Sequence, residues 1–543
     1  MQDNKTQVTL FTKQNCVHCA RAKSLLDSHG IAYDVVDTSN NNEAGQLSIY
    51  LSSQLTLPQV FIGGRLIGGA DDLERLTEAG ELEQAVENAK AANANGLPAL
   101  AMNTDVLSEG VKIANMADYI APIDATRSTD PEVLPLLQFY KAFFGYWPHC
   151  YGYLFRAPEA TKTFIYTTVM SVSGGFVKEI LGIDVQHALG FATSQAQGCG
   201  YCQVHTAAIG QKVENSHAIR KFYDGEIDYS DPTFAEVEWA LIDLAGRASV
   251  NKVTDELLAR IHKLAGDKAP LFITAAAKMA SIFGFLNTFN DLTGVEIEAG
   301  WNNDVQSVFN IEMGTHTPAG DVSDNPDNLS HDIPQGDISI PEIFARYDSI
   351  AGDDYKAYMK EHLGLAPNWE DRWAEPIRAR HAVMYVTLVG TDSPQISAEL
   401  KHLMARVSAV VRGHDYLSAA EGFMAYQASE KTDISLKRVA ECYNAAAGYS
   451  VEEGLFTDAE VAALATAFTS AQIPMNVIEK TATQLRNHYD QDGMIQLFVV
   501  CAVSASIQRW CAVMKPEFEP EVLSFFEEHN LPLSTQKIKI NAT

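Results

Sequence analysis

Residues 8–19, VTLFTKQNCVHC, join an apolar run to a pair of cysteines separated by two residues. The run at 8–11 has the composition of a buried strand, and the segment from Cys16 to Ser28 has helical character and is followed by Gly30. The cysteine pair therefore lies where a strand gives way to a helix. Unpaired backbone N–H groups and the helix dipole favour negative charge there, so we expect Cys16 to be held partly as a thiolate.

Strand and helix signals continue to alternate beyond this stretch. Strands are predicted at 32–36, 59–62 and 66–67, and the last two are joined by a hairpin turn at Gly63-Gly64. A final helix is predicted over 71–86. The order β-α-β-α-β-β-α predicts a small mixed sheet covered by helices.

Three motifs in this block resemble the glutaredoxin family: Lys13-x-x-Cys16-x-x-Cys19, Thr56-Leu57-Pro58 and Gly68-Gly69-Ala70-Asp71-Asp72. The resemblance implies a thioredoxin-like α/β fold with a catalytic Cys16/Cys19 dithiol and a cis proline beside it. It also implies that glutathione is the reductant and that no cofactor stays bound. The expected glutathione contacts are Lys13, Leu57, Pro58, Gly69, Ala70, Asp71 and Asp72.

Two alternatives stay open at the first dithiol. The family most often has Pro-Tyr between the cysteines, whereas this chain has Val17-His18. His18 either alters the redox behaviour of the dithiol or simply faces solvent. The dithiol could instead be half of a zinc site completed by Cys199 and Cys202, but that separation is far from zinc-ribbon spacing.

The charge of the chain limits its partners. Among 543 residues, 40 Lys and Arg oppose 69 Asp and Glu, a net charge of −29, which disfavours nucleic acid and anionic membrane surfaces. The longest apolar stretch, 493–508, is short for a spanning helix, and the N-terminus has no apolar leader. Eight cysteines are too few for a disulfide scaffold. We expect a cytoplasmic protein.

A second cysteine motif, CxxCxxH, lies at Cys199, Cys202 and His205. The preceding helix should break near Gly198, which places Cys199 at a new helix start. The three residues advance about 300° per step on that helix and can share one face. His205 would then accept a thiol proton. Core packing of these residues and zinc ligation are the alternatives, and we expect no metal.

The surroundings resemble the alkylhydroperoxidase D-like branch of the carboxymuconolactone decarboxylase superfamily. The resemblance rests on Ser194-x-x-x-Gly198-Cys199-x-Tyr201-Cys202-x-x-His205 and on a nearly uncharged helix at 271–289. It implies an all-α thiol oxidoreductase, commonly oligomeric, that reduces peroxides or serves a disulfide partner such as a peroxiredoxin-type client. The branch usually has a relay Glu twelve residues before the first cysteine. Here His187 holds that position, in either a relay or a structural role.

The C-terminal part repeats features of this helical block. The segments 198–202, 254–257 and 271–282 have counterparts at 413–417, 457–460 and 497–507. We therefore predict a tandem duplication. The second copy has His414, Leu417 and Ala420 in place of the CxxCxxH residues, so we expect it to serve packing or assembly without thiol chemistry.

These features predict a glutaredoxin-like α/β domain followed by two all-α domains. The predicted parts are 1–90, a linker at 91–104, 105–313, an acidic linker at 314–341, and 342–543. The linkers are predicted from Ala/Asn-rich and Asp/Pro-rich composition.

The fusion of two dithiols predicts a self-recycling, glutathione-linked thiol peroxidase or disulfide reductase. Electrons would pass from glutathione to Cys16/Cys19, then to Cys199/Cys202, and then to a peroxide or disulfide. Tethering raises the effective concentration of one dithiol at the other, and both are expected at exposed helix starts. A decarboxylase-like enzyme with a regulatory glutaredoxin domain and a redox-gated binding scaffold are the alternatives.

Overall fold

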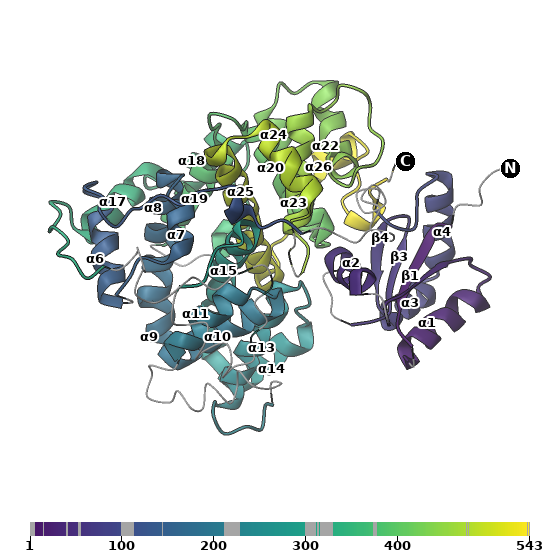
Figure 1. Ribbon diagram of the computed structural model, residues 1–543, viewed down its shortest axis with the longest axis horizontal. Coiled ribbons are helices and arrows are strands. Elements are labelled where there is room, and N and C mark those ends of the chain that lie inside the picture. The colour runs from purple at the N-terminus through teal and green to yellow at the C-terminus, as the bar shows by residue number, and fades with distance from the viewer. Residues whose placement is uncertain are drawn as a thin grey trace. The chain divides into compact units, whose positions relative to one another are not determined.

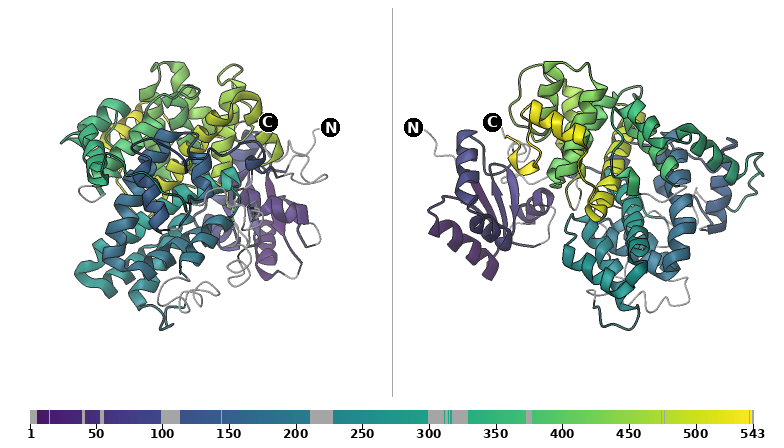
Figure 2. Two further views of the ribbon diagram at one scale, coloured as in Figure 1. Left: turned by 60° about the vertical axis from the view of Figure 1, so that its left-hand side comes forward. Right: turned by 180° about the vertical axis from the view of Figure 1, so that it is seen from behind.

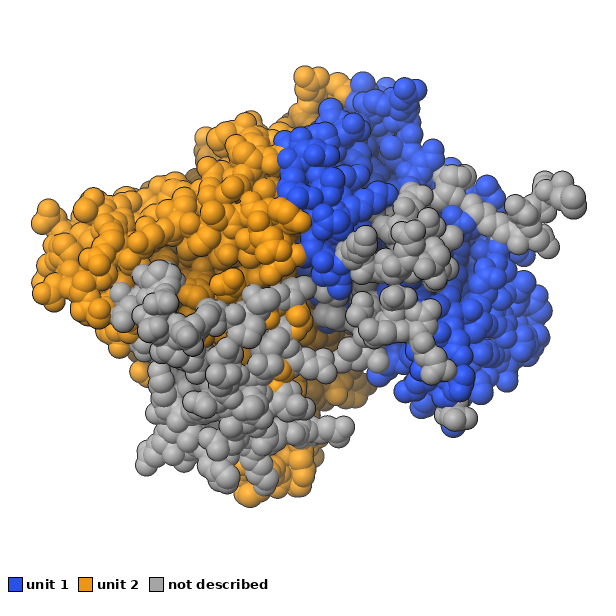
Figure 3. All heavy atoms as spheres, in the orientation of Figure 1, with its two compact units in different colours: residues 1–114, 433–488, 534–543 blue, residues 115–432, 489–533 orange. Residues whose placement is uncertain are grey.

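The computed structural model divides the chain into two compact units (Figure 3). Unit 1 comprises residues 1–114, 433–488 and 534–543, and unit 2 comprises 115–432 and 489–533. The structure describes residues 6–14, 16–39, 42–52, 56–98, 113–143, 145–210, 228–298, 311, 314, 316, 329–372, 377–473, 475, 477–539 and 541.

Unit 1 contains a four-stranded mixed sheet of order β2-β1-β3-β4 (Figure 1). β1 runs parallel to β2 and antiparallel to β3, which pairs antiparallel with β4. The predicted strands are confirmed to within two residues at each end. The bounds are Val8–Thr12 (β1), Asp34–Asp37 (β2), Gln59–Ile62 (β3) and Arg65–Gly68 (β4).

Helices from the same segment cover the sheet. The alternating residues Val8, Leu10, Val60 and Ile62 form a core with α1, α3 and α4. The single helix predicted over 71–86 is wrong, because Gly80 adopts φ +71° and separates α3 from α4. The helices are α1 (Val17–Ser28), α2 (Asn42–Ser52), α3 (Ala70–Glu78) and α4 (Leu82–Ala91).

The predicted linker at 91–104 is partly wrong. Ala94 and Leu97 are buried, and a Cβ atom on Gly96 would lie 2.3 Å from the Thr9 side-chain oxygen. Small residues in this segment thus allow its backbone to pack closely against β1. The same small residues are typical of flexible linkers, which is why the composition predicted one. Residues 99–104 lie outside the described residues.

The rest of unit 1 comes from the C-terminal part of the chain. It holds α22 (Asp433–Ala446), α23 (Asp458–Ser470), α24 (Glu479–His488) and a short turn at Thr535–Lys537. The Tyr449 hydroxyl donates to the Gly63 carbonyl at 3.2 Å, and Arg65 Nη1 donates to the Thr535 carbonyl at 2.9 Å. The prediction that 342–543 forms one domain is therefore wrong.

Unit 2 is built from helices. The first half contains α6 (Leu134–Phe143), α7 (His149–Leu154), α8 (Pro158–Phe164), a π-helical segment (Ile165–Val177), α9 (Lys178–Leu181), α10 (Ile183–Gln197), α11 (Gly200–Gly210), α13 (Glu236–Ser249), α14 (Asp255–Ala265) and α15 (Ala269–Thr293). The second half contains α17 (Ile340–Ala351), α18 (Tyr355–Leu363), α19 (Ile377–Tyr385), α20 (Ala398–Val411), α21 (Asp415–Ala428), α25 (Gln491–Met514) and α26 (Pro520–Glu528).

The predicted acidic linker at 314–341 does not separate the two helical halves. The Leu329 amide donates to the Gly145 carbonyl at 3.1 Å, and Gln138 Nε2 donates to the Pro334 carbonyl at 3.0 Å. Backbone groups of this segment therefore find partners on the first half, which its composition does not reveal. The aspartates at 321, 324 and 327 lie outside the described residues.

The longest helices, α15 and α25, lie side by side at the centre of unit 2 (Figures 1 and 2). The Ser281 and Ser506 hydroxyl oxygens are 2.8 Å apart across this contact. Residues 255–293 and 491–514 are both long and apolar enough to cross a membrane, but 67% and 94% of their most apolar windows are buried inside the fold. Their apolar surface is explained by packing against other helices.

Replacing Gly284 by Ala should destabilise the α15–α25 contact. A Cβ atom there would lie 2.9 Å from the Ala505 carbonyl oxygen and from Ser506 Cα, so the helices must move apart. We expect a loss of about 1–3 kcal/mol in the free energy of unfolding, measured with urea. The control is Gly246→Ala in α13, where the nearest atom is 3.7 Å away. Equal effects of the two substitutions would contradict the packing argument.

The two halves share one arrangement around a left-handed glycine. Gly198 (φ +86°) joins α10 to α11, and Gly413 (φ +71°) joins α20 to α21. The predicted match of Thr254 with Thr457 is wrong, because the helices that these two residues cap do not occupy equivalent positions in the two halves. Thr254 caps α14, directly before α15, whereas Thr457 caps α23, which is separated from α25 by α24. An N-cap threonine is common to many helix starts and carries little alignment information.

Candidate functional site

The first dithiol lies at the start of α1, as predicted. Cys16 is the N-cap residue and is half-buried, whereas Cys19 is buried, and the two form a disulfide. The Cys19 amide donates to Cys16 Sγ at 3.1 Å. The Leu57–Pro58 peptide is cis, as predicted, and the Leu57 carbonyl oxygen is 3.8 Å from Cys16 Sγ.

The acidic turn predicted to contact glutathione starts α3. The Gly69 amide donates to Asp72 Oδ2 at 2.7 Å, so Asp72 caps the helix. Asp71 pairs with Arg21 of α1, and Asp72 pairs with Arg75. The turn is thus held next to the helix that carries the dithiol. The glutathione contacts of this turn, of Lys13 and of the Leu57–Pro58 element remain a prediction.

The second dithiol also lies at a helix start, but it is not exposed. Cys199 and Cys202 are free thiols with exposed fractions of 0% and 3%. The Cys202 amide donates to Cys199 Sγ at 3.5 Å. The expectation of an exposed dithiol is therefore wrong. Helix periodicity indicates which residues share a face, but α10 and α15, which pack around α11, cover that face.

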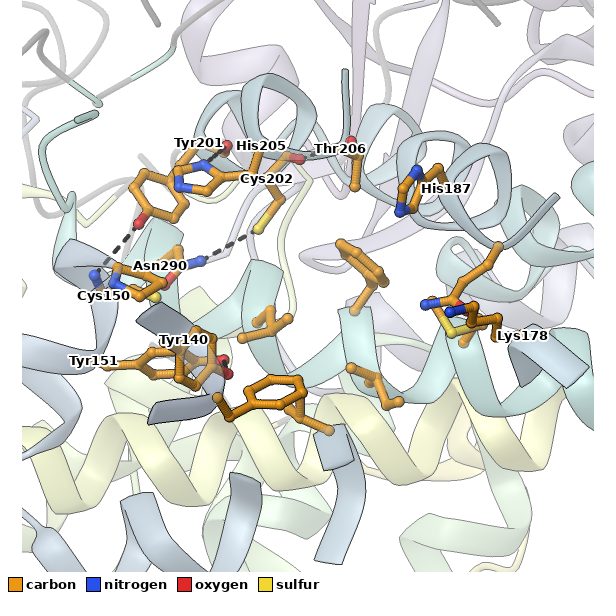
Figure 4. A pocket seen from close by; sticks show the side chains of 18 of the residues that line it. Tyr140, Cys150, Tyr151, Lys178, His187, Tyr201, Cys202, His205, Thr206 and Asn290 are labelled. Atoms are coloured by element: carbon orange, nitrogen blue, oxygen red, sulfur yellow. Dashed lines mark hydrogen bonds between the residues drawn. The ribbon is translucent and has the colours of Figure 1, made fainter. Parts of the chain in front are cut away.

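Cys202 lines a cavity of about 310 Å³ in unit 2 (Figure 4). Asn290 Nδ2 donates to Cys202 Sγ at 3.2 Å. An amide that donates to sulfur stabilises the thiolate over the thiol. Other residues of the wall include Tyr140, Cys150, Tyr151, Lys178, His187, Tyr201, His205 and Thr206.

His205 is held by a buried carboxylate. Its Nε2 is 2.9 Å from Glu298 Oε2, and its Nδ1 is 2.8 Å from the Tyr201 carbonyl oxygen. Glu298 also accepts from the Tyr201 hydroxyl at 2.7 Å and from the His149 amide at 2.8 Å. Burial raises the pKa of Glu298, but the charge of His205 and its hydrogen bond outweigh burial and bring that pKa to about 2. Both ring nitrogens of His205 thus face groups other than the thiols. The expectation that His205 accepts a proton directly from a thiol is therefore wrong.

His187 also lines the cavity, and burial lowers its pKa to about 4. It is therefore neutral near pH 7. Within the described residues, no hydrogen-bond partner faces its Nδ1 atom. The carboxylate beside His205 comes from Glu298, after α15, and not from the position of His187.

Cys199 contacts a different set of groups. Its Sγ atom is 4.0 Å from His316 Nε2, which is 3.0 Å from Asp291 Oδ1. Burial raises the pKa of the Cys199 thiol well above its usual value, and its side-chain hydrogen bonds with Cys202 and Asp291 and the charge of Asp291 add to this. The two thiols of the motif therefore have different surroundings.

A buried arginine from the second half adds positive charge near the dithiol. Arg509 of α25 donates from Nη2 to Gln197 Oε1 at 2.9 Å. Burial lowers the pKa of Arg509 to about 10, while the two thiols and Asp291 oppose that shift. The second half thus contributes a charged group to the first half's site.

The frame that holds Glu298 recurs in the second half without the residues of the CxxCxxH motif. Glu519 accepts from the Tyr416 hydroxyl at 2.6 Å and from the Asn368 amide at 2.5 Å, as Glu298 does from Tyr201 and His149. The predicted replacements for the CxxCxxH residues are all buried: His414, Leu417 and Ala420. This recurrence supports the predicted duplication.

Sequence reasoning missed five residues of the site: Cys150, Asn290, Asp291, Glu298 and His316. Asn290 and Asp291 carried a signal, because they are polar and lie at the end of a helix whose only other charged residue is Lys278. Glu298 and His316 lie in segments without periodicity, and Cys150 is an isolated cysteine. No spacing rule connects these three to the dithiol.

Comparison with known proteins identifies the N-terminal domain. The family model named Glutaredoxin matches residues 8–67. Glutaredoxin 3 of Escherichia coli (strain K12) is 38% identical over 76 residues, which cover 14% of this chain and 92% of that protein. Hybrid peroxiredoxin hyPrx5 of Haemophilus influenzae is 42% identical over 69 residues, or 12% of this chain and 28% of that protein.

A solved structure matches the same domain. The crystal structure of a buckwheat glutaredoxin–glutathione complex shares 28% sequence identity with a TM-score of 0.15, covering 16% of this chain and 80% of that one. The Cys16–Cys19 disulfide at the start of α1 lies within residues 8–67, which the family model matches. Through this N-terminal domain, the chain belongs to the glutaredoxin family.

Proposed function

We propose that this protein is a glutathione-linked thiol peroxidase or disulfide reductase in which Cys202 attacks the substrate. Its glutaredoxin domain implies glutathione-dependent thiol–disulfide oxidoreductase activity. One observation supports the assignment of Cys202 as the attacking thiol. The Cys202 side chain lines a cavity together with His205, which is held by the buried Glu298 carboxylate. The resemblance of the helical part to alkylhydroperoxidase D-like proteins agrees with this chemistry.

The proposed reaction needs both thiols of the motif. With a hydroperoxide, the Cys202 thiolate attacks the terminal oxygen, the O–O bond breaks, and an alcohol leaves. The Cys202 sulfenic acid then reacts with the Cys199 thiol to form the disulfide and water. With a disulfide substrate, Cys202 forms a mixed disulfide that Cys199 resolves. In both cases two electrons leave the dithiol.

The location of each thiol assigns these roles. Cys202 lines the cavity and accepts a hydrogen bond from Asn290, which favours its thiolate. Burial raises the pKa of Cys199 and so favours its thiol over its thiolate in the absence of a bound ligand, as suits a resolving thiol. In the wall, His187 can exchange protons with substrate or water, and the His205–Glu298 pair can hold a proton close by.

Glutathione would restore the reduced state through the Cys16/Cys19 dithiol. The buckwheat glutaredoxin was solved as a complex with glutathione, and the relative from Haemophilus influenzae is a hybrid peroxiredoxin. Both agree with a glutathione-supplied domain that serves peroxide reduction. We also propose a cytoplasmic location, homo-oligomerisation and a possible role toward a peroxiredoxin-type client.

A coupled assay tests the proposed function. The protein is mixed with glutathione, glutathione reductase, NADPH and an oxidising substrate, which is either an organic hydroperoxide or a small disulfide. The rate of NADPH oxidation reports the turnover of that substrate. Cys202→Ser should remove at least about 99% of hydroperoxide turnover. The control is Cys501→Ser, which alters a buried cysteine of α25 that forms no disulfide and lies outside the cavity wall. Full turnover by Cys202→Ser would overturn the assignment.

Direct exchange between the two dithiols is a separate prediction. In Cys19→Ser combined with Cys202→Ser, or with Cys199→Ser, oxidation should trap a peptide that links Cys16 to the remaining thiol of the second motif. Mass spectrometry of the digested protein detects the linked peptide. If neither double variant yields it, the glutaredoxin domain serves some other client.

A further inference from the structure

The described residues contain one cluster that ordinary thiol exchange does not require. Cys199, Asp291 and His316 come from three separate segments, and one ligand atom from each lies within 4.8 Å of the others. All three side chains are buried. A buried thiol, carboxylate and imidazole that meet at one point match the donor set of a zinc site.

The orientation of His316 favours a cation over a simple hydrogen bond. Its Nδ1 atom is 2.9 Å from the Val295 carbonyl oxygen and donates to it, so Nε2 carries the lone pair whenever the ring is neutral. Nε2 faces both Asp291 Oδ1 and Cys199 Sγ. A backbone carbonyl that fixes the far nitrogen is the usual support of a metal-bound histidine.

The spacing of the ligand atoms is close to that of a bound ion. Tetrahedral Zn²⁺, with bonds of about 2.3 Å to sulfur and about 2.0 Å to nitrogen or oxygen, separates S from N by about 3.6 Å and N from O by about 3.3 Å. The observed separations are 4.0 Å for Cys199 to His316 and 3.0 Å for His316 to Asp291. These two separations differ from the tetrahedral values by less than about half an ångström.

The charges also call for a cation at this point. Within the described residues, Asp291 Oδ2 is buried without a hydrogen-bond partner. Burying an ionised carboxylate without full compensation is costly. Arg509 contributes positive charge nearby but donates to Gln197, so it does not occupy the point where the three ligand atoms meet.

We propose that Cys199, Asp291 and His316 bind a Zn²⁺ ion when the dithiol is reduced. A thiolate and an imidazole together select zinc over magnesium or calcium. Three protein ligands leave a fourth position for water or for Cys202, one turn along the same helix. Formation of the Cys199–Cys202 disulfide removes the sulfur ligand, so the ion binds the reduced state only.

Metal titration of the full-length reduced protein tests the proposal without peroxide or glutathione. After treatment with a chelator, Zn²⁺ is added in competition with a chromophoric chelator. His316→Gln and Cys199→Ser should each weaken binding by at least about 100-fold. The matched control is His402→Gln, which alters a buried histidine that lies 2.8 Å from Glu421 but outside the cluster. Absence of Zn²⁺ binding, or equal binding by all variants, overturns the proposal.

A second measurement needs no substitution. Co²⁺ bound to the reduced protein should give the sulfur-to-metal charge-transfer band and the tetrahedral d–d bands of a thiolate site. Diamide should abolish both, because the two thiols lose two electrons and two protons to its azo bond as the disulfide forms. A cobalt spectrum without sulfur bands would overturn the site. The peroxide assay is run with a chelator present, so that its result does not depend on bound Zn²⁺. The proposed peroxidase function and the proposed zinc site can therefore fail independently.

Discussion

Cys16→Ser should abolish glutathione-dependent disulfide reduction by the N-terminal domain, whereas Cys19→Ser should accumulate a mixed disulfide between glutathione and Cys16. Cys16 is the half-buried N-cap residue of α1, and Cys19 is buried. The more accessible of the two sulfurs, at the helix start, is the better nucleophile, because substrate can reach it and the helix start stabilises its thiolate. The loss of activity is measured as the rate at which a small mixed disulfide with glutathione is reduced, with NADPH consumption as the readout.

The control for this assignment is Cys442→Ser, which alters a buried cysteine of α22 in the same unit that forms no disulfide. It should retain full activity, because no part of the dithiol exchange passes through it. Intact-mass and peptide analysis of Cys19→Ser after incubation with oxidised glutathione locates the adduct. An adduct on another cysteine, or activity in Cys16→Ser, would contradict the assigned order of attack.

Local signals account for the part of the fold that was predicted well. The strand Gln59–Ile62 matches its prediction residue for residue, because an apolar β-branched run and the Gly63-Gly64 turn fix both its identity and its end. The break at Gly80 was missed, since a glycine inside a helical pattern is compatible with either continuation or a stop.

Long-range packing accounts for what the sequence could not predict. The segment that carries α22, α23 and α24 follows a helical half in sequence but belongs to the unit of the sheet. Contacts such as Tyr449 to Gly63 decide this membership, and no periodicity indicates a contact between residues so far apart.

The candidate site shows the same limit. Spacing placed Cys199, Cys202 and His205 on one helix, and that much is confirmed. Spacing did not predict that the motif is buried, or that His205 faces Glu298 and not a thiol. The partner of His205 lies in an irregular segment, where side-chain identity alone gives no position.

Glu298→Gln should lower both stability and turnover. The substitution leaves His205 without its charged partner inside the protein, and breaking a buried ion pair typically costs about 3–5 kcal/mol. Urea denaturation at pH 7 measures the change in the free energy of unfolding. Hydroperoxide turnover should also fall by about 10²-fold or more if the pair moves protons.

The pH dependence of that loss separates an ion pair from a neutral contact. Glu298 has a pKa of about 2, below its ordinary value of 4.5, so its ionised form stabilises the fold above pH 4.5 and this contribution disappears as pH falls toward 2. The gap in stability between the wild type and Glu298→Gln should therefore shrink by about 3 kcal/mol over that window.

Glu519→Gln is the matched control for this experiment, because Glu519 has the same tyrosine and backbone donors but no histidine. Burial raises the pKa of Glu519 above 4.5, so the stability linked to its protonation is present at low pH and is lost as pH rises. The gap between the wild type and Glu519→Gln should not shrink as pH falls. Parallel pH profiles for the two variants would show that His205 contributes no charge at Glu298, and the proton-relay role would then fail while the zinc site and the Cys202 assignment stand.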